Sequence, residues 1–237
     1  MKVIILCGGI GSRLAEETKL IPKPMIKIGK LPILEHIIKI YNHYGFNKII
    51  LATGYKNKII NRYFKKYKNI DCIYTGKNTS TGGRLLRLKK FFKPKDNFML
   101  TYGDGLINMN LHHLLDFHLK HKKIATLTSV KPPARFGEVF LKGSKVIKFE
   151  EKSQLNRNWI NGGFFVLNYK IFKFIKGDQV MLEREPLTKL VKLKQLMAYK
   201  HYGFWQCMDT MRDKNILNEL WKKGYAPWSK LSKKLIY

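Results

Sequence analysis

Near its start the chain reads Lys2-Val3-Ile4-Ile5-Leu6-Cys7-Gly8-Gly9-Ile10-Gly11-Ser12-Arg13-Leu14, an apolar run that leads directly into a glycine turn. A short apolar run that ends in a turn predicts a buried strand, and glycines allow the following backbone to come close to a phosphate. The Gly-x-Gly-x-x-Gly dinucleotide fingerprint is absent because Leu14 occupies its third glycine position, and no Gly-Lys-Ser/Thr Walker sequence follows. We therefore predict a phosphate-binding loop of another kind, in which the Arg13 guanidinium can clamp phosphate oxygens.

Strand-like and helix-like patterns alternate through the first half of the chain. The strand patterns occupy residues 2–7, 48–53, 70–75, 98–102 and 124–130. Amphipathic helix patterns separate them at residues 33–44, 59–67, 85–92 and 111–121. Such alternation predicts an α/β fold, with a mainly parallel sheet covered by helices on both faces, whose ligands bind at the carboxyl ends of the strands. The loops after Cys7 and Tyr102 are therefore the first candidates for a binding site.

The second half of the chain is less regular. Its strand patterns lie at residues 139–141, 146–149 and 164–167, and its helix patterns at 185–193 and 211–223. We find no linker rich in proline, glycine or serine and no internal repeat. We therefore predict one mixed-sheet domain over residues 1–237, in which the half from about 131 to 237 supplies a lid or a second wall to a site formed by the half from about 1 to 130.

The composition combines a strong positive charge with enough apolar residues for a core. Lys and Arg number 46 against 16 Asp and Glu, a formal charge of +30, while 45% of the residues are hydrophobic. That hydrophobic content excludes a disordered basic tail. Of the cations, 38 are Lys spread along the whole chain, so we expect a solvated surface that steers anionic ligands and no specific nucleic-acid partner. A basic nucleic-acid-binding module is the alternative from a different functional class.

The apolar runs and the cysteines indicate the compartment. No apolar run approaches the ~20 residues that a membrane span needs, and the first run is too short for the core of a signal peptide, so we expect no membrane association. Cys7, Cys72 and Cys207 are odd in number and far apart, which indicates reduced thiols and a cytoplasmic protein.

Two charged residues lie in settings suited to chemistry. Lys23 lies between Pro22 and Pro24, which stiffen its backbone and exclude it from a helix interior. Asp104 lies between two glycines at the end of a predicted strand, where its carboxylate is a suitable hard-oxygen ligand for Mg²⁺. A tight turn would produce the same Gly-Asp-Gly pattern, so both interpretations of Asp104 stay open.

Other conspicuous side chains have simpler interpretations. His118 and His121 have the spacing of metal ligands, but carboxylates are scarce nearby, so we expect a solvated helix face. Cys207 has no flanking base to activate its thiol, and we expect it to fill space in a core. Phe204 and Trp205 could stack on a nucleotide base or pack over the site.

Several segments together resemble one enzyme family. They are Glu16-Glu17-Thr18, Pro22-Lys23-Pro24-Met25, Thr81-Gly82-Gly83-Arg84, Tyr102-Gly103-Asp104-Gly105, Pro133-Ala134-Arg135-Phe136-Gly137, Ile160-Asn161-Gly162-Gly163-Phe164-Phe165-Val166, Glu185-Pro186-Leu187 and Gly203-Phe204-Trp205-Gln206-Cys207-Met208-Asp209-Thr210. With the glycine turn that precedes them, these segments resemble the sugar-1-phosphate nucleotidyltransferases and, within that family, the glucose-1-phosphate cytidylyltransferases. The resemblance extends in order from Met1 to Trp228.

The resemblance implies a Rossmann-like nucleotidyltransferase fold, with a nucleotide-binding half over about residues 1–130 and a sugar-binding half beyond it. It implies an Mg²⁺-dependent reaction in which the phosphate of a sugar 1-phosphate, here expected to be glucose 1-phosphate, attacks the α-phosphorus of CTP in line and pyrophosphate leaves. The product would be a CDP-sugar of the kind used in cell-surface polysaccharide biosynthesis. The implied partners are CTP, a phosphorylated small-molecule acceptor and further copies of the chain in a homo-oligomer.

The resemblance also implies roles for individual residues. Arg13 and Lys23 would be catalytic, and Asp104 and Asp209 would share one Mg²⁺. The residues expected to bind the nucleotide are Leu6, Gly8, Gly9, Gly11, Ser12, Thr81, Gly82, Arg84 and Gly103. Those expected to bind the sugar phosphate are Glu151, Lys152, Asn161 and Gly162.

Two departures from the family pattern bear on specificity. The stretch between Tyr55 and Thr81 is shorter than the resemblance implies, which leaves the base and the number of subunits open. Ser153 stands where the family has proline after the Glu-Lys pair, which affects the sugar side. The same chemistry with another nucleoside triphosphate or another phosphorylated acceptor is therefore the alternative within the family.

Overall fold

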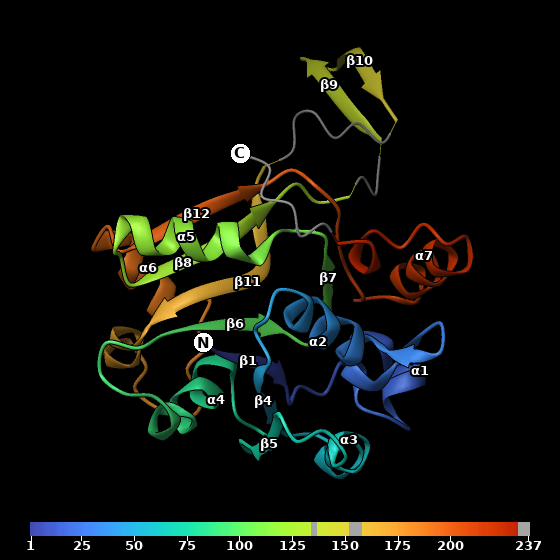
Figure 1. The fold of residues 1–237 in the computed structure, drawn as a ribbon. Helices are drawn as coiled ribbons and strands as arrows, with labels where there is room; N and C mark the ends of the chain where they lie inside the picture. The colour runs from blue at the N-terminus through green and yellow to red at the C-terminus, as the bar shows by residue number, and fades with distance from the viewer. Residues whose placement is uncertain (134–136, 152–157, 232–237) are drawn as a thin grey trace.

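The structure, a computed structural model, describes residues 1–133, 137–151 and 158–231, and its centre is a seven-stranded sheet (Figure 1). The strands of this sheet are β1 (Lys2–Cys7), β4 (Lys48–Thr53), β5 (Ile70–Tyr74), β6 (Asn97–Tyr102), β8 (Ala125–Val130), β11 (Ile160–Asn168) and β12 (Leu196–His201). Their order across the sheet is β12-β8-β11-β6-β1-β4-β5. β11 is antiparallel to both of its neighbours, and the other neighbouring pairs are parallel. The predicted α/β fold with a mixed, mainly parallel sheet is confirmed.

Strand β1 lies inside the sheet because its alternate side chains supply two separate hydrophobic cores. Val3 and Ile5 belong to one core, whereas Ile4 and Leu6 belong to the other, and all four are buried. The helices that contribute to the first core are α2 (Ile33–His43), α3 (Asn57–Phe64), α5 (Leu111–His121) and α7 (Met211–Lys222). Those that contribute to the second are α4 (Thr81–Arg87) and α6 (Glu185–Lys192). Helices therefore cover both faces of the sheet, which is what a mainly parallel sheet requires.

Shorter elements connect and extend this framework. Small two-stranded sheets are formed by β2 (Lys27–Ile28) with β3 (Leu31–Pro32), β7 (Gly105–Ile107) with β13 (Trp205–Cys207), and β9 (Glu138–Lys142) with β10 (Lys145–Glu150). The β9–β10 hairpin projects from the body of the protein (Figure 1). The remaining elements are α1 (Ala15–Thr18) and short 3₁₀ helices at Ser12–Leu14, Lys23–Met25, Lys89–Phe91, Tyr169–Phe174 and Pro227–Ser229. No helix in the described ranges is long and apolar enough to cross a membrane.

One helix begins earlier than its sequence pattern predicts. The pattern over residues 85–92 predicts a helix there, but α4 starts at Thr81 and ends at Arg87. Gly82 and Gly83 pack directly against the backbone of Val180 and Asp178, where a Cβ on Gly83 would come within 2.2 Å of the Asp178 carbonyl oxygen, and the Gly83 N–H donates to the Val180 carbonyl. A segment from the second half of the chain thus fixes the start of a helix in the first half.

The prediction that His118 lies on a solvated face of α5 is wrong, because the residue is only 2% exposed. Its Nδ1 lies 2.8 Å from Thr126 Oγ1 on β8, and His121 Nε2 lies 2.7 Å from the same oxygen. His121 Nδ1 accepts the Lys123 N–H, so the neutral His121 ring donates through Nε2 and leaves the Thr126 hydroxyl to donate to His118. Burial, and then His121, lower the pKa of His118 to about 4.

We predict that His118 makes the protein less stable in mild acid. Its pKa is about 4 in the folded chain and about 6.5 when unfolded, so below pH 6.5 the unfolded state binds more protons, and stability falls as the pH drops from 6.5 towards 4. The expected loss between pH 7.5 and pH 5 is up to about 2 kcal/mol. Urea titrations at both pH values measure it. His118→Gln should flatten this pH dependence, whereas His113→Gln on the same helix should not, and equal slopes in all three proteins would refute the assignment.

Candidate active site

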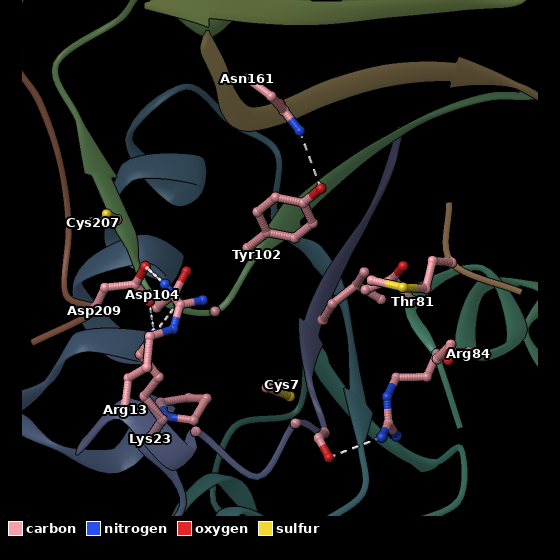
Figure 2. A pocket seen from close by; sticks show the side chains of 18 of the residues that line it. Cys7, Arg13, Lys23, Thr81, Arg84, Tyr102, Asp104, Asn161, Cys207 and Asp209 are labelled. Carbon is pink, nitrogen blue, oxygen red and sulfur yellow. Dashed lines mark hydrogen bonds and ion pairs between the residues drawn. The ribbon is translucent and has the colours of Figure 1, made fainter. Parts of the chain in front are cut away.

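A cavity of about 690 Å³ opens at the carboxyl ends of β1 and β6, the edge to which the sequence directs attention (Figure 2). It lies beside the glycine loop after β1 and the Gly103-Asp104 turn after β6. The residues with an expected role that line it are Leu6, Gly8, Gly9, Gly11, Arg13, Lys23, Thr81, Arg84, Gly103, Asp104, Asn161 and Asp209. Segments from both halves of the chain therefore meet around one space.

Some residues with an expected role lie away from the cavity wall. The residues that line the cavity do not include Ser12, Gly82, Glu151 or Gly162. The close approach of Gly82 to the backbone of Val180 gives this glycine a packing role, and the Gly162 carbonyl accepts a hydrogen bond from Trp205 Nε1 at 2.8 Å. Lys152 lies outside the described residues.

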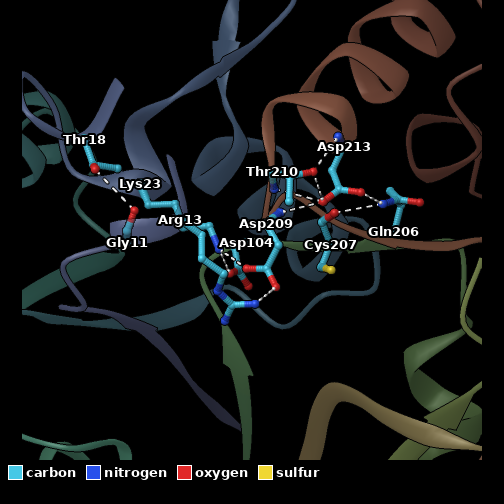
Figure 3. Close-up of polar contacts among 10 residues, drawn as sticks. All are labelled: Gly11, Arg13, Thr18, Lys23, Asp104, Gln206, Cys207, Asp209, Thr210 and Asp213. Atoms are coloured by element: carbon cyan, nitrogen blue, oxygen red, sulfur yellow. Dashed lines mark hydrogen bonds and ion pairs between the residues drawn. The ribbon is translucent and has the colours of Figure 1, made fainter. Parts of the chain in front are cut away.

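The charged centre of the cavity is one ammonium group held between two carboxylates (Figures 2 and 3). Lys23 Nζ lies 2.5 Å from Asp104 Oδ2 and 2.6 Å from Asp209 Oδ1, and Arg13 contacts the second oxygen of Asp209 at 2.6 Å. Three of these four residues come from the first half of the chain, whereas Asp209 follows Lys23 by 186 residues. The structure thus brings together the proposed catalytic cations and the proposed metal ligands.

Strand pairing accounts for the meeting of the two aspartates. Asp104 immediately precedes β7 and Asp209 closely follows β13, and these strands pair antiparallel with Cys207 opposite Gly105. The Met208 N–H donates to the Asp104 carbonyl at 2.9 Å, which continues the ladder beyond the strands. Because the two carboxylates stand at the same end of one ladder, their separation is set by backbone geometry.

The Lys23 ammonium is charged and partly shielded from water. Its side chain is 12% exposed, and it begins the short Lys23–Met25 turn, whose N-cap is Pro22 and whose second residue is Pro24. Burial by itself lowers the pKa of Lys23, but Asp104 and Asp209 outweigh burial and hold that pKa above its ordinary value. Lys23 therefore carries a permanent positive charge at neutral pH.

The two carboxylates suit a hard divalent cation. Both reach the same nitrogen, so their oxygens converge on one region of the cavity, and carboxylate oxygens are ligands that Mg²⁺ uses together with phosphate oxygens and water. The described residues contain no cluster of three or more His, Cys, Asp and Glu side chains suited to a metal. Asp104 and Asp209 therefore fit a site that shares its ion with a phosphorylated ligand better than a closed protein cage.

A third carboxylate, that of Asp213, orients the loop that carries Asp209 (Figure 3). Asp213, which is 3% exposed, accepts hydrogen bonds from the backbone N–H groups of Asp209 and Thr210, from the Thr210 hydroxyl and from Gln206 Nε2. Thr210 and Asp213 also form a reciprocal capping box at the start of α7. The Thr-x-x-Asp spacing is visible in the sequence, so this supporting residue could have been found there.

Arg84 links the glycine loop after β1 to the neighbouring segments after β4 and β5. It is 4% exposed, and its guanidinium donates to the carbonyls of Gly8, Thr53, Gly76 and Lys77 at 2.6–3.3 Å. A Cβ at Gly8 would come within 2.2 Å of this guanidinium, so a larger residue there would displace Arg84 from its acceptors. Burial lowers the pKa of Arg84. These acceptors are protein oxygens at the carboxyl ends of β1, β4 and β5, which Arg84 therefore ties together.

The opposite wall of the cavity is aromatic and amide in character. Tyr102 and Trp205 line it beside Asn161, whose Nδ2 donates to the Tyr102 hydroxyl oxygen at 3.2 Å (Figure 2). Phe204 packs against Trp228, with ring centroids 5.5 Å apart, so of the two aromatic candidates only Trp205 lines the cavity. Cys207 also lines it, and burial followed by the nearby aspartates raises the pKa of its thiol to about 12, which makes the thiol a poor nucleophile.

Comparison with known proteins agrees with this geometry. The model of the nucleotidyl transferase family matches residues 2–211, and the chain belongs to this family. Glucose-1-phosphate cytidylyltransferases of Salmonella typhimurium and Salmonella typhi are each 42% identical to it over 253 aligned residues, which cover 96% of this chain and 98% of theirs. The resemblance inferred from the sequence motifs is confirmed.

Two details of the comparisons refine this result. The 253 aligned positions exceed the 237 residues of this chain, so the chain lacks residues that the Salmonella proteins have. Among solved structures, HddC from Yersinia pseudotuberculosis superposes with a TM-score of 0.73 at 24% identity, covering 93% of this chain and 99% of that one. This second likeness shows that the fold is shared.

We predict that Arg84 contributes mainly to stability. Arg84→Lys should lower the free energy of unfolding by about 2–4 kcal/mol, because one ammonium cannot reach carbonyls in three separate loops and leaves buried acceptors unpaired. Arg87→Lys is the matched control, since Arg87 makes an exposed ion pair with Asp178 and should cost less than about 1 kcal/mol. Urea unfolding at pH 7 distinguishes the two. Equal stability of Arg84→Lys and the unmodified chain would contradict this role.

Proposed function

We propose that this protein transfers a cytidylyl group from CTP to a sugar 1-phosphate, with glucose 1-phosphate as the acceptor, and releases pyrophosphate. An oxygen of the sugar phosphate forms a bond to the α-phosphorus of CTP, while the bond from that phosphorus to the bridging oxygen of the β-phosphate breaks. The observation that carries the proposal is the convergence of Arg13, Lys23, Asp104 and Asp209 in a chain that matches glucose-1-phosphate cytidylyltransferases over almost its whole length.

The cationic side chains neutralise charge as the two anionic reactants approach each other. Lys23 Nζ is within hydrogen-bond distance of both aspartates, so a phosphate that reaches those carboxylates through a shared ion is also within reach of the ammonium. Arg13, exposed at the mouth of the cavity, can turn from Asp209 to phosphate oxygens. An Mg²⁺ ion held by Asp104 and Asp209 would supply charge stabilisation to the transferring phosphoryl group. Catalysis is then mainly positioning and electrostatics.

Each substrate has a wall of the cavity. The glycine loop, Gly103 and Thr81 are proposed to bind the nucleotide, since backbone N–H groups at a glycine turn suit phosphate. Asn161 is proposed to bind the acceptor, since its amide lies on the opposite wall beside Trp205. The division into a nucleotide half (about 1–130) and a sugar half (about 131–237) of one domain, the homo-oligomer and the cytoplasmic location are proposed on the same basis. The CDP-sugar would serve cell-surface polysaccharide biosynthesis.

We predict that both carboxylates and Mg²⁺ are needed for turnover. Asp104→Asn and Asp209→Asn should each lower kcat/KM at least about a hundredfold, because metal charge stabilisation is worth several kcal/mol. Asp116→Asn, on the exposed surface of α5, is the matched control and should retain activity. Pyrophosphate release measured with Mg²⁺ and with excess EDTA tests both requirements. Undiminished activity in EDTA would eliminate the metal role.

Substrate choice is tested by a two-way screen. We expect kcat/KM with glucose 1-phosphate to be highest for CTP among the four ribonucleoside triphosphates and dTTP, and kcat/KM with CTP to be highest for glucose 1-phosphate in a panel of phosphorylated acceptors. Specificity of this kind comes from hydrogen bonds that the wrong substrate leaves unmade. Another triphosphate that equals CTP would overturn the base, and another acceptor used far better would overturn the sugar. No turnover with any pair, together with tight nucleic-acid binding, would favour the basic binding module.

A further inference from the structure

The Glu183 carboxylate accepts hydrogen bonds from two hydroxyl groups that line the cavity. Thr81 Oγ1 donates to Glu183 Oε2 at 2.6 Å, and the Tyr102 hydroxyl donates to Glu183 Oε1 at 2.6 Å. Thr81 begins α4 on the proposed nucleotide side, whereas Tyr102 ends β6 and faces Asn161 (Figure 2). Glu183 itself lies behind the wall, in the turn that precedes α6.

The Glu183 carboxylate sets the direction of the hydrogen bonds that it makes, because carboxylate oxygens act as acceptors. Both hydroxyls donate to it. The Tyr102 oxygen is then left as an acceptor for Asn161 Nδ2 at 3.2 Å, while Asn161 Oδ1 accepts the Gly163 N–H at 2.9 Å. These two bonds fix which end of the Asn161 amide points to which partner.

The Thr81 hydroxyl is constrained in the same way. It donates to Glu183 and accepts the Leu182 N–H at 2.9 Å, so the start of α4 is bonded to the segment that carries Glu183. Burial, and then Glu183, raise the pKa of Tyr102, so the tyrosine stays protonated and remains a donor. One carboxylate therefore determines the geometry of side chains on both walls.

Neither an ion pair nor the charge of the expected ligands explains why residue 183 is a glutamate. Among the described residues, no lysine, arginine or histidine makes an ion pair with Glu183, although the chain carries a formal charge of +30. It also lies next to a cavity that we propose to bind two anionic substrates, where a negative charge costs binding energy. A neutral acceptor would avoid that cost, but it could not compel both hydroxyls to donate.

We propose that Glu183 is a positioning residue that couples the two substrate subsites, orienting Asn161 for the acceptor through Tyr102 and holding Thr81 for the nucleotide. This inference rests on the proposed nucleotidyl transfer. Its function would be to keep both walls in the geometry that places the acceptor phosphate against the nucleotide.

The test compares steady-state constants for Glu183→Gln, Tyr102→Phe and Thr81→Val. Tyr102→Phe should raise KM for the acceptor about tenfold and leave KM for the nucleotide within twofold. The tenfold change corresponds to about 1.4 kcal/mol of binding free energy, lost because Asn161 is no longer oriented by the Tyr102 hydroxyl. Thr81→Val should do the reverse. Glu183→Gln should raise both KM values, and in Glu183→Gln/Tyr102→Phe the acceptor KM should be no higher than in the single variants. Glu185→Gln, two residues away in an exposed pair with Lys189, should match the unmodified chain.

Two results would overturn the coupling role. One is a Glu183→Gln protein with both KM values within twofold of the unmodified chain; the other is a double variant whose acceptor KM is the product of the single effects. If Glu183→Gln does not fold, the opposite KM effects of Tyr102→Phe and Thr81→Val carry the test, and the absence of that split refutes it.

A crystal structure of Glu183→Gln gives a readout that does not depend on activity. We expect the Asn161 amide to leave the Tyr102 oxygen, and an unchanged amide would contradict the proposal even if the enzyme assay fails. An inactive unmodified chain would overturn the proposed function alone, whereas an active one with an unmoved Asn161 would overturn only the role of Glu183.

Discussion

The contact of the Lys23 ammonium with Asp104 and Asp209 is the constraint on which the site depends. Two carboxylates this close repel each other, and the lysine between them removes that repulsion. The surrounding structure serves this contact: the β7–β13 ladder sets the spacing of the aspartates, and Asp213 holds the loop after β13. The stiff Pro22–Pro24 backbone carries the lysine to them. The proposed catalytic centre is thus built from backbone pairing and from a lysine shared by two aspartates.

The overall charge and the local charge act at different ranges. A formal charge of +30 spread over the surface attracts anionic reactants from a distance, but salt screens it within about 10 Å. Inside the cavity the balance is different, because carboxylates and cations are paired, and Arg84 is engaged by carbonyl oxygens. We therefore expect recognition of a particular substrate to depend on a few partly buried hydrogen bonds.

The sequence predicts this fold well where the pattern is local. β1, β4 and α5 have the predicted bounds, since an apolar run or a helical period marks each of them. It misses β12, whose half-exposed edge position gives no clear alternation, and it misplaces the start of α4. Sequence motifs identify Arg13, Lys23 and the two aspartates as candidates. Contacts between distant segments determine the position of Glu183 and the burial of His118, and no local pattern encodes such contacts.

The lateness of Asp209 in the chain has a consequence for how the protein matures during synthesis. Lys23 and Asp104 leave the ribosome long before their third partner, so a nascent chain can form much of the parallel sheet while the charged cluster is still incomplete. Contacts between residues so far apart in sequence form slowly because the intervening loop must first be closed. The charged cluster is therefore among the last features to assemble. The proposed active site is complete only when the rest of the fold has formed.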